Sequence, residues 1–155
     1  MVLHPRPVIL PPTQRNEWEC GIAAIRYLML LLNHDTERWI NQAIGIAGTT
    51  KKDGTSHAGI MQVIAWIGYK PVEQYCQIQD VPVPSIVNYQ WNGDGHYGVL
   101  VSKTRRHCFI FNPYDGEIDR WRLWDFNDAF FSKRYGKLWS VSVKSIPSPQ
   151  SPHTA

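Results

Sequence analysis

Hydrophobic residues recur at helical spacing in the first half of the chain. In segment 19–33 the apolar positions lie three and four residues apart and the interior is nearly all apolar, which predicts a long, buried helix. Two more helices are predicted over 36–46 and 56–67, the second with Ser56 as its N-cap and Gly68 as its stop. The N-terminal half is therefore expected to be helical.

The pattern changes after Gly68. Five short segments rich in β-branched and aromatic residues follow, separated by turn residues, and they predict strands. They are KPVEQY, PSIVNYQ, HYGVLVSK, RHCFIFN and KLWSVSVKSI. Only Thr104 and Arg105 separate the third from the fourth, which predicts a hairpin, and NPYDGE supplies a further turn. WDFNDAFFSKR is expected to form a last helix, and DGEIDRWRLWDF an exposed segment at the sheet edge.

Length and composition indicate one core. A chain of 155 residues, 43% of them hydrophobic, is the size of a single globular domain. We expect that domain to span 1–146, with the proline- and serine-rich residues 147–155 as a disordered tail. The fold class is α+β, with the helical half packed on a C-terminal antiparallel sheet.

Charge and hydropathy exclude several classes of partner. The net charge of +3 comes from scattered basic residues, so nucleic acid is not an expected partner. No apolar run is long enough to span a membrane. Residues 1–12 lack the apolar core and cleavage site of a secretory signal. The protein is expected to be cytoplasmic, or exported without a cleavable signal peptide.

The cysteines and histidines are not expected to form a metal site. Cys20, Cys76 and Cys108 include no C-x-x-C pair and are expected to be free thiols. His34 and His57 lie at predicted helix ends without zinc-ligand spacing. No metal or organic cofactor is expected. Cys76 and Cys108 lie in strand-like segments and are interpreted as core or sheet residues.

Cys20 lies where a thiol can be activated. It stands at the start of the first predicted helix, and the unpaired backbone N–H groups of a helix N-terminus favour the thiolate by lowering the thiol pKa. Acyl transfer also needs a general acid and base, a group that orients it, and donors for the oxyanion. In the alternative interpretation, Cys20 is a small core residue.

His96, Asn112 and Gln14 are candidates for the other roles. His96 begins the strand HYGVLVSK, and Asn112 ends the next one; a hairpin would bring these ends side by side. Gln14, six residues before Cys20, is expected to offer its amide N–H beside the Cys20 backbone N–H as an oxyanion hole. Taken singly, each has a simpler explanation, such as a turn-forming Asn112 before Pro113. Together they favour a catalytic site.

Four further residues are expected to line a substrate cleft. Aromatic side chains beside the nucleophile and the base would narrow the groove to small residues such as glycine. The tryptophans fit equally well as core or rim aromatics. The four residues are Trp18, Gly21, Trp91 and Gly95.

These motifs resemble a known family, the papain-like cysteine peptidases, and within it the bacteriocin-processing peptidases that remove double-glycine leaders. The matching segments are QRNEWECG before the first helix, HYGVLV, FIFNPYDG and GIMQVIAWIGYKPV. The resemblance runs from about Gln14 to Phe131.

The resemblance implies a papain-like fold and a role for each polar residue. Cys20 would be the nucleophile, held as a thiolate, His96 the general base and acid, Asn112 the group that orients the imidazole, and Gln14 the oxyanion donor. The reaction would be hydrolysis of a peptide bond, after a Gly-Gly-type sequence in a leader or target protein. The implied partners are a peptide or protein substrate and an exporter, or an inhibitor or immunity protein.

Two departures from the family pattern leave alternatives open. Many members carry aspartate where Asn112 stands, although asparagine also serves in papain-like enzymes. The best-known members are fused to an exporter, whereas this sequence contains no membrane span and no phosphate-binding loop. One alternative is a toxin or effector that uses the same residues as a deamidase or acyltransferase. The other is a catalytically idle module that binds an extended peptide.

Overall fold

The computed structural model describes residues 13, 14, 16, 18–34, 36–130 and 138–145. The predicted disordered tail, the first 12 residues and the last part of the final predicted helix lie outside this range.

The three predicted N-terminal helices are confirmed. They are α1 (Cys20–Leu31), α2 (Ile40–Ala47), preceded by the 3-10 turn η1 (Glu37–Trp39), and α3 (His57–Ile67). The Ser56 hydroxyl caps α3 by accepting a hydrogen bond from the Gly59 backbone N–H at 3.0 Å, and Gly68 ends the helix with φ 112°. Among the described residues, no helix is long and apolar enough to cross a membrane.

The second half of the chain forms one six-stranded antiparallel sheet, as predicted. Its order is β1-β6-β2-β3-β4-β5, so the final strand lies between the first two. The segment predicted as an exposed sheet edge contains the edge strand β5. The strands are β1 (Tyr69–Tyr75), β2 (Ser85–Trp91), β3 (Asp94–Lys103), β4 (His107–Asn112), β5 (Glu117–Arg122) and β6 (Trp139–Ser145).

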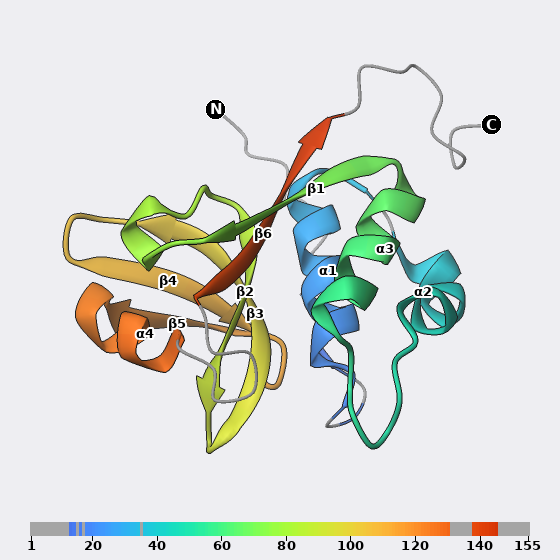
Figure 1. Ribbon diagram of the computed structural model, residues 1–155, viewed down its shortest axis with the longest axis horizontal. Coiled ribbons are helices and arrows are strands. Elements are labelled where there is room, and N and C mark those ends of the chain that lie inside the picture. The colour runs from blue at the N-terminus through green and yellow to red at the C-terminus, as the bar shows by residue number, and fades with distance from the viewer. Residues whose placement is uncertain (1–12, 15, 17, 35, 131–137, 146–155) are drawn as a thin grey trace, which may run out of the picture.

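Helices cover both faces of this sheet (Figure 1). Neighbouring residues of β2 show the alternation, because Ile86 packs in the core under α1 and α3 whereas Val87 packs in a second core on the other face. The short helix α4 (Leu123–Phe130) and the 3-10 turn η2 (Ile78–Asp80) cover the second core. The fold is thus a three-layer α+β arrangement. The N-terminal helices α1, α2 and α3 form the larger helical layer, on one face of the sheet.

The hairpin of β3 and β4 sets the positions of two candidate residues. In its register Val99 pairs with Phe111, so His96 and Asn112 lie near the same end of the hairpin. The turn after Asn112 closes with Gly116 at φ 75°, a left-handed conformation that glycine adopts without strain.

A close contact between α2 and α3 gives a stability test. A Cβ atom on Gly59 would lie 2.2 Å from the carbonyl oxygen of Ala47, so Gly59→Ala must push the two helices apart. We expect a loss of roughly 1–3 kcal/mol in the free energy of unfolding, as for other overpacked sites, measured by urea denaturation. Gly45→Ala is the matched control because no atom lies within 4 Å of its Cβ position, and a gain of about 0.5–1 kcal/mol is expected. A Gly59→Ala variant as stable as the parent would contradict the packing.

Candidate active site

Cys20 is the first residue of α1, and its sulfur lies against strand β3. The backbone N–H groups of Tyr97, Gly21 and Cys20 itself lie close enough to the sulfur to oppose a rise in its pKa. The next residue, Gly21, lets the start of α1 approach α3 and the loop before it, since a Cβ there would lie 2.9 Å from the Thr55 Cβ and 3.0 Å from Ile60. The helix start is thereby packed between β3 and the loop that leads to α3.

His96 and Asn112 form a buried hydrogen-bonded pair. Nε2 of His96 lies 2.8 Å from Oδ1 of Asn112, and the two residues are 6% and 1% exposed. Oδ1 also accepts the Tyr114 backbone N–H at 3.0 Å, while Nδ2 of Asn112 donates to Asp119 at 3.2 Å. With Oδ1 facing the imidazole, Nε2 carries the proton and the lone pair of a neutral ring is on Nδ1.

Aromatic side chains fix the plane of the imidazole. Trp91 stacks on His96 with ring centroids 4.8 Å apart, and Tyr89 meets it edge-on at 5.6 Å. Tyr114 packs against Trp91 at 5.0 Å. His96 also lines the hollow that contains Cys20.

Gln14 is hydrogen-bonded to the turn that follows Asn112 at the end of β4. Its backbone N–H donates to the Pro113 carbonyl at 2.9 Å, and its side-chain Nε2 donates to the Asn16 carbonyl at 2.9 Å. Oε1 is buried and has no hydrogen-bond partner among the described residues. One of the two amide hydrogens is thus committed to Asn16, which leaves the other for a ligand.

A hollow of about 310 Å³ brings most of the candidates together. Asn112 lies behind it, bonded to His96. Trp18 and Gly21, expected in the cleft from the sequence, are not among its lining residues. The hollow is lined by Gln14, Cys20, Trp91, Asn92, Asp94, Gly95, His96 and Tyr114.

Sequence analysis missed Asn92, Asp94, Tyr114 and Asp119. The first two belong to the NGDG loop and Tyr114 to the NPYDG turn, both of which adjoin a candidate residue in the sequence. Asp119 gives no such signal because its contact with Asn112 depends on the β4–β5 register.

Burial opposes charge on both reacting groups. Desolvation raises the pKa of the Cys20 thiol above its ordinary value of 9.0, although the three backbone N–H groups act against this. Desolvation also lowers the pKa of His96 below 6.5, against the opposing effects of Asn112, Asp115 and Asp119. Burial therefore opposes the resting thiolate that the sequence analysis expects, whereas the backbone N–H groups at the helix start favour it.

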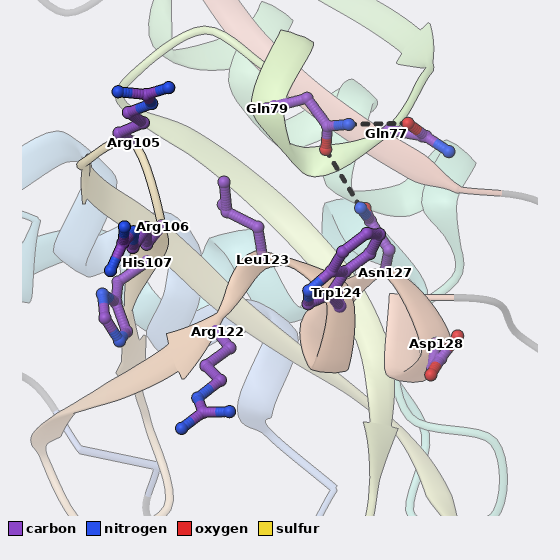
Figure 2. A pocket seen from close by; sticks show the side chains of 10 residues that line it. All are labelled: Gln77, Gln79, Arg105, Arg106, His107, Arg122, Leu123, Trp124, Asn127 and Asp128. Atoms are coloured by element: carbon purple, nitrogen blue, oxygen red, sulfur yellow. Dashed lines mark hydrogen bonds between the residues drawn. The ribbon is translucent and has the colours of Figure 1, made fainter.

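A second hollow, of about 780 Å³, lies at the other end of β4 and β5. Figure 2 shows Arg105, Arg106 and His107 on one side and the amide side chains of Gln79 and Asn127 on the other. It is five residues along β4 from Asn112, roughly 17 Å at the usual rise of a strand, and no cysteine lines it. The described lining of this hollow therefore offers no thiol nucleophile.

Within the described ranges, no group of three or more histidine, cysteine, aspartate or glutamate side chains is arranged to hold a metal ion.

Solved structures share this fold. The peptidase domain of Streptococcus ComA, a bifunctional ABC transporter of a quorum sensing pathway, matches with a TM-score of 0.72 and 16% identity over 87% of this chain and 97% of that one. A double glycine motif protease from an AMS/PCAT transporter, in complex with the leader peptide, matches at 0.71 and 18% over 90% and 91%. The N-terminal peptidase C39-like domain of a toxin secretion ATP-binding protein from Vibrio parahaemolyticus matches at 0.64 and 12% over 84% and 100%.

The sequence comparisons give the family. A search of curated proteins found no match. The model of the peptidase C39 family matches residues 11–133, which cover α1 through α4 and contain Cys20, His96 and Asn112. The chain therefore belongs to the peptidase C39 family and is a cysteine peptidase.

Proposed function

We propose that the protein hydrolyses a peptide bond through a triad of Cys20, His96 and Asn112. The observation that supports this most directly is the 2.8 Å contact between His96 and Asn112, beside a hollow that His96 shares with Cys20. That contact leaves Nδ1 of His96 as the base that faces the hollow.

The reaction begins with attack on the peptide carbonyl. Nδ1 of His96 takes the thiol proton as Sγ of Cys20 bonds to the carbonyl carbon. The free amide hydrogen of Gln14 and the Cys20 backbone N–H stabilise the oxyanion. The C–N bond then breaks, and the imidazolium protonates the leaving amine.

The second half of the reaction releases the acyl group. His96 removes a proton from a water molecule that attacks the thioester carbonyl. The C–S bond breaks, the carboxylic acid leaves, and Cys20 regains its proton from the imidazolium. Asn112 holds the ring in place through both halves.

We propose a leader peptide with a Gly-Gly-type sequence before the scissile bond as the substrate. Trp91 and Tyr114 pack together over a hollow of only about 310 Å³, and Gly95 contributes no side chain to its wall. Small residues suit such a site. One solved neighbour is a double glycine motif protease bound to its leader peptide. Because neighbours belong to ABC transporters, an exporter is the proposed partner.

Replacement of the nucleophile tests this function. We expect Cys20→Ala to lower kcat on a synthetic double-glycine leader peptide by at least ~10³-fold, as loss of a triad nucleophile does, with the products resolved by mass spectrometry. Cys76→Ala is the control because Cys76 is half-buried and lies outside the hollow. An intact target heavier by about one dalton would indicate deamidation instead. Peptide binding without turnover in the parent would indicate an idle binding module.

The alkylation rate of Cys20 tests whether Cys20 and His96 are both uncharged in the free protein. Because burial raises the pKa of Cys20 and lowers that of His96, we expect the free protein to hold a neutral thiol and a neutral imidazole at pH 7. We expect slow iodoacetamide labelling of Cys20 below pH 7 and a rise toward pH 9, measured by mass spectrometry at each cysteine. Rapid labelling at pH 5–6 would instead indicate a thiolate–imidazolium pair.

The pH profile of kcat/KM follows from the same two shifts. Activity is lost on the acid side as His96 gains a proton, and since its pKa is lowered, this limb lies below the ordinary 6.5. On the basic side activity is lost when Cys20 ionises and the pair can no longer protonate the leaving amine, above the ordinary 9.0. A basic limb between pH 8 and 9 would contradict this assignment.

A further inference from the structure

Three polar side chains form a row across neighbouring strands. His96 lies on β3, Asn112 on β4 and Asp119 on β5. Nε2 of His96 donates to Oδ1 of Asn112 at 2.8 Å, and Nδ2 of Asn112 donates to Oδ2 of Asp119 at 3.2 Å. The amide therefore joins the imidazole to a carboxylate that does not itself contact His96.

The register of β4 and β5 creates this row. Asn112 pairs with Glu117, and Ile110 pairs with Asp119, so Asp119 is the diagonal neighbour of Asn112 on the same face of the sheet. Diagonal neighbours in an antiparallel pair are within reach of polar side chains.

We propose that Asp119 is a positioning residue for peptide hydrolysis. It holds the Asn112 amide in the orientation that makes Nδ1 of His96 the base, and it supplies the negative charge that asparagine lacks. This inference rests on the proposed function of Cys20, His96 and Asn112.

The orientation argument follows from donors and acceptors. A carboxylate only accepts hydrogen bonds, so Asp119 can face only the Nδ2 end of the amide. The Tyr114 backbone N–H donates to the other end, Oδ1. A flipped amide would present Nδ2 to His96, favour the tautomer with hydrogen on Nδ1, and leave no base beside Cys20.

The charge argument concerns the imidazolium that forms during attack. Burial disfavours the charged ring, whereas the bond to Asn112 and the charges of Asp115 and Asp119 favour it. Among the described residues, the other titratable groups near the ring are Cys20, Asp94 and Tyr114, which line the same hollow, and Tyr89, which packs edge-on against the ring.

Asp115 provides a matched control. Its carboxylate also favours the charged ring, but its side chain accepts the Glu117 backbone N–H at 2.9 Å and has no hydrogen bond to Asn112. Neutralising Asp115 therefore removes a comparable charge and leaves the amide orientation unchanged.

An aspartate at position 112 would place two carboxylates in contact. The present donor and acceptor are 3.2 Å apart, and two carboxylates at that separation cannot both ionise without strong repulsion. Positions 112 and 119 should therefore accept one carboxylate and one amide, with either position carrying the carboxylate.

The test is an exchange of the two side chains. We expect Asp119→Asn to lower kcat/KM by about 10-fold, the order of one charge-assisted hydrogen bond, and Asn112→Asp to lower it at least as far at pH 8. The double variant Asn112→Asp/Asp119→Asn should return to within roughly threefold of the parent. Asn112→Asp/Asp115→Asn should not recover. A swapped variant no more active than Asn112→Asp overturns the proposal.

A spectroscopic measurement separates this proposal from the function. Imidazole ¹⁵N chemical shifts report the tautomer of His96 without substrate. We expect the hydrogen on Nε2 in the parent and a mixture of the two tautomers in Asp119→Ala. This measurement replaces the exchange test if Asn112→Asp does not fold. An unchanged tautomer in Asp119→Ala overturns the role of Asp119. Full hydrolysis by Cys20→Ala would defeat the proposed function instead, while the ¹⁵N shifts would still report on Asp119.

Discussion

The packing of α1 against β3 brings Cys20 and His96 to the same site, and the rest of the site depends on this contact. It sets Cys20 against the backbone of Tyr97, whose N–H reaches the sulfur, while the next residue back, His96, carries the imidazole. The Tyr97 hydroxyl is held in turn at 2.7 Å from Nδ1 of His57, and the His57 ring stacks on Trp139 with centroids 3.9 Å apart. Polar and aromatic contacts in the core thus fix the helical layer relative to the sheet.

The polar groups of the site are buried, and hydrogen bonds between them offset the free-energy cost of removing them from water. An unpaired buried polar group costs on the order of 1–3 kcal/mol, and Asn112 avoids this cost with bonds to His96, Tyr114 and Asp119. The same burial disfavours the charged forms of Cys20 and His96. In the proposed mechanism, charge would then separate only during attack, when the oxyanion donors and nearby carboxylates stabilise it.

The sequence predicted local features better than long-range ones. Helical spacing and caps located α1 and α3, and turn residues located the hairpin that carries His96 and Asn112. Strand β5 was recognised only as a sheet edge, because its alternating charged and aromatic residues do not form an apolar run. Asp119 was missed because its role depends on register. The burial that opposes a thiolate at Cys20 was also missed, because a helix N-terminus is visible in a sequence, whereas desolvation by packing is not.

The position of β6 in the sheet affects the order in which the strands can pair during synthesis. This strand, at the end of the described chain, pairs with both β1 and β2, and it brings Trp139 beneath His57. In the strand order β1-β6-β2-β3-β4-β5, β1 joins the strands that carry His96 and Asn112 only through β6. A chain still emerging from the ribosome can therefore pair β2, β3, β4 and β5 in sequence order, but β1 has no neighbour in the sheet until the last strand is made.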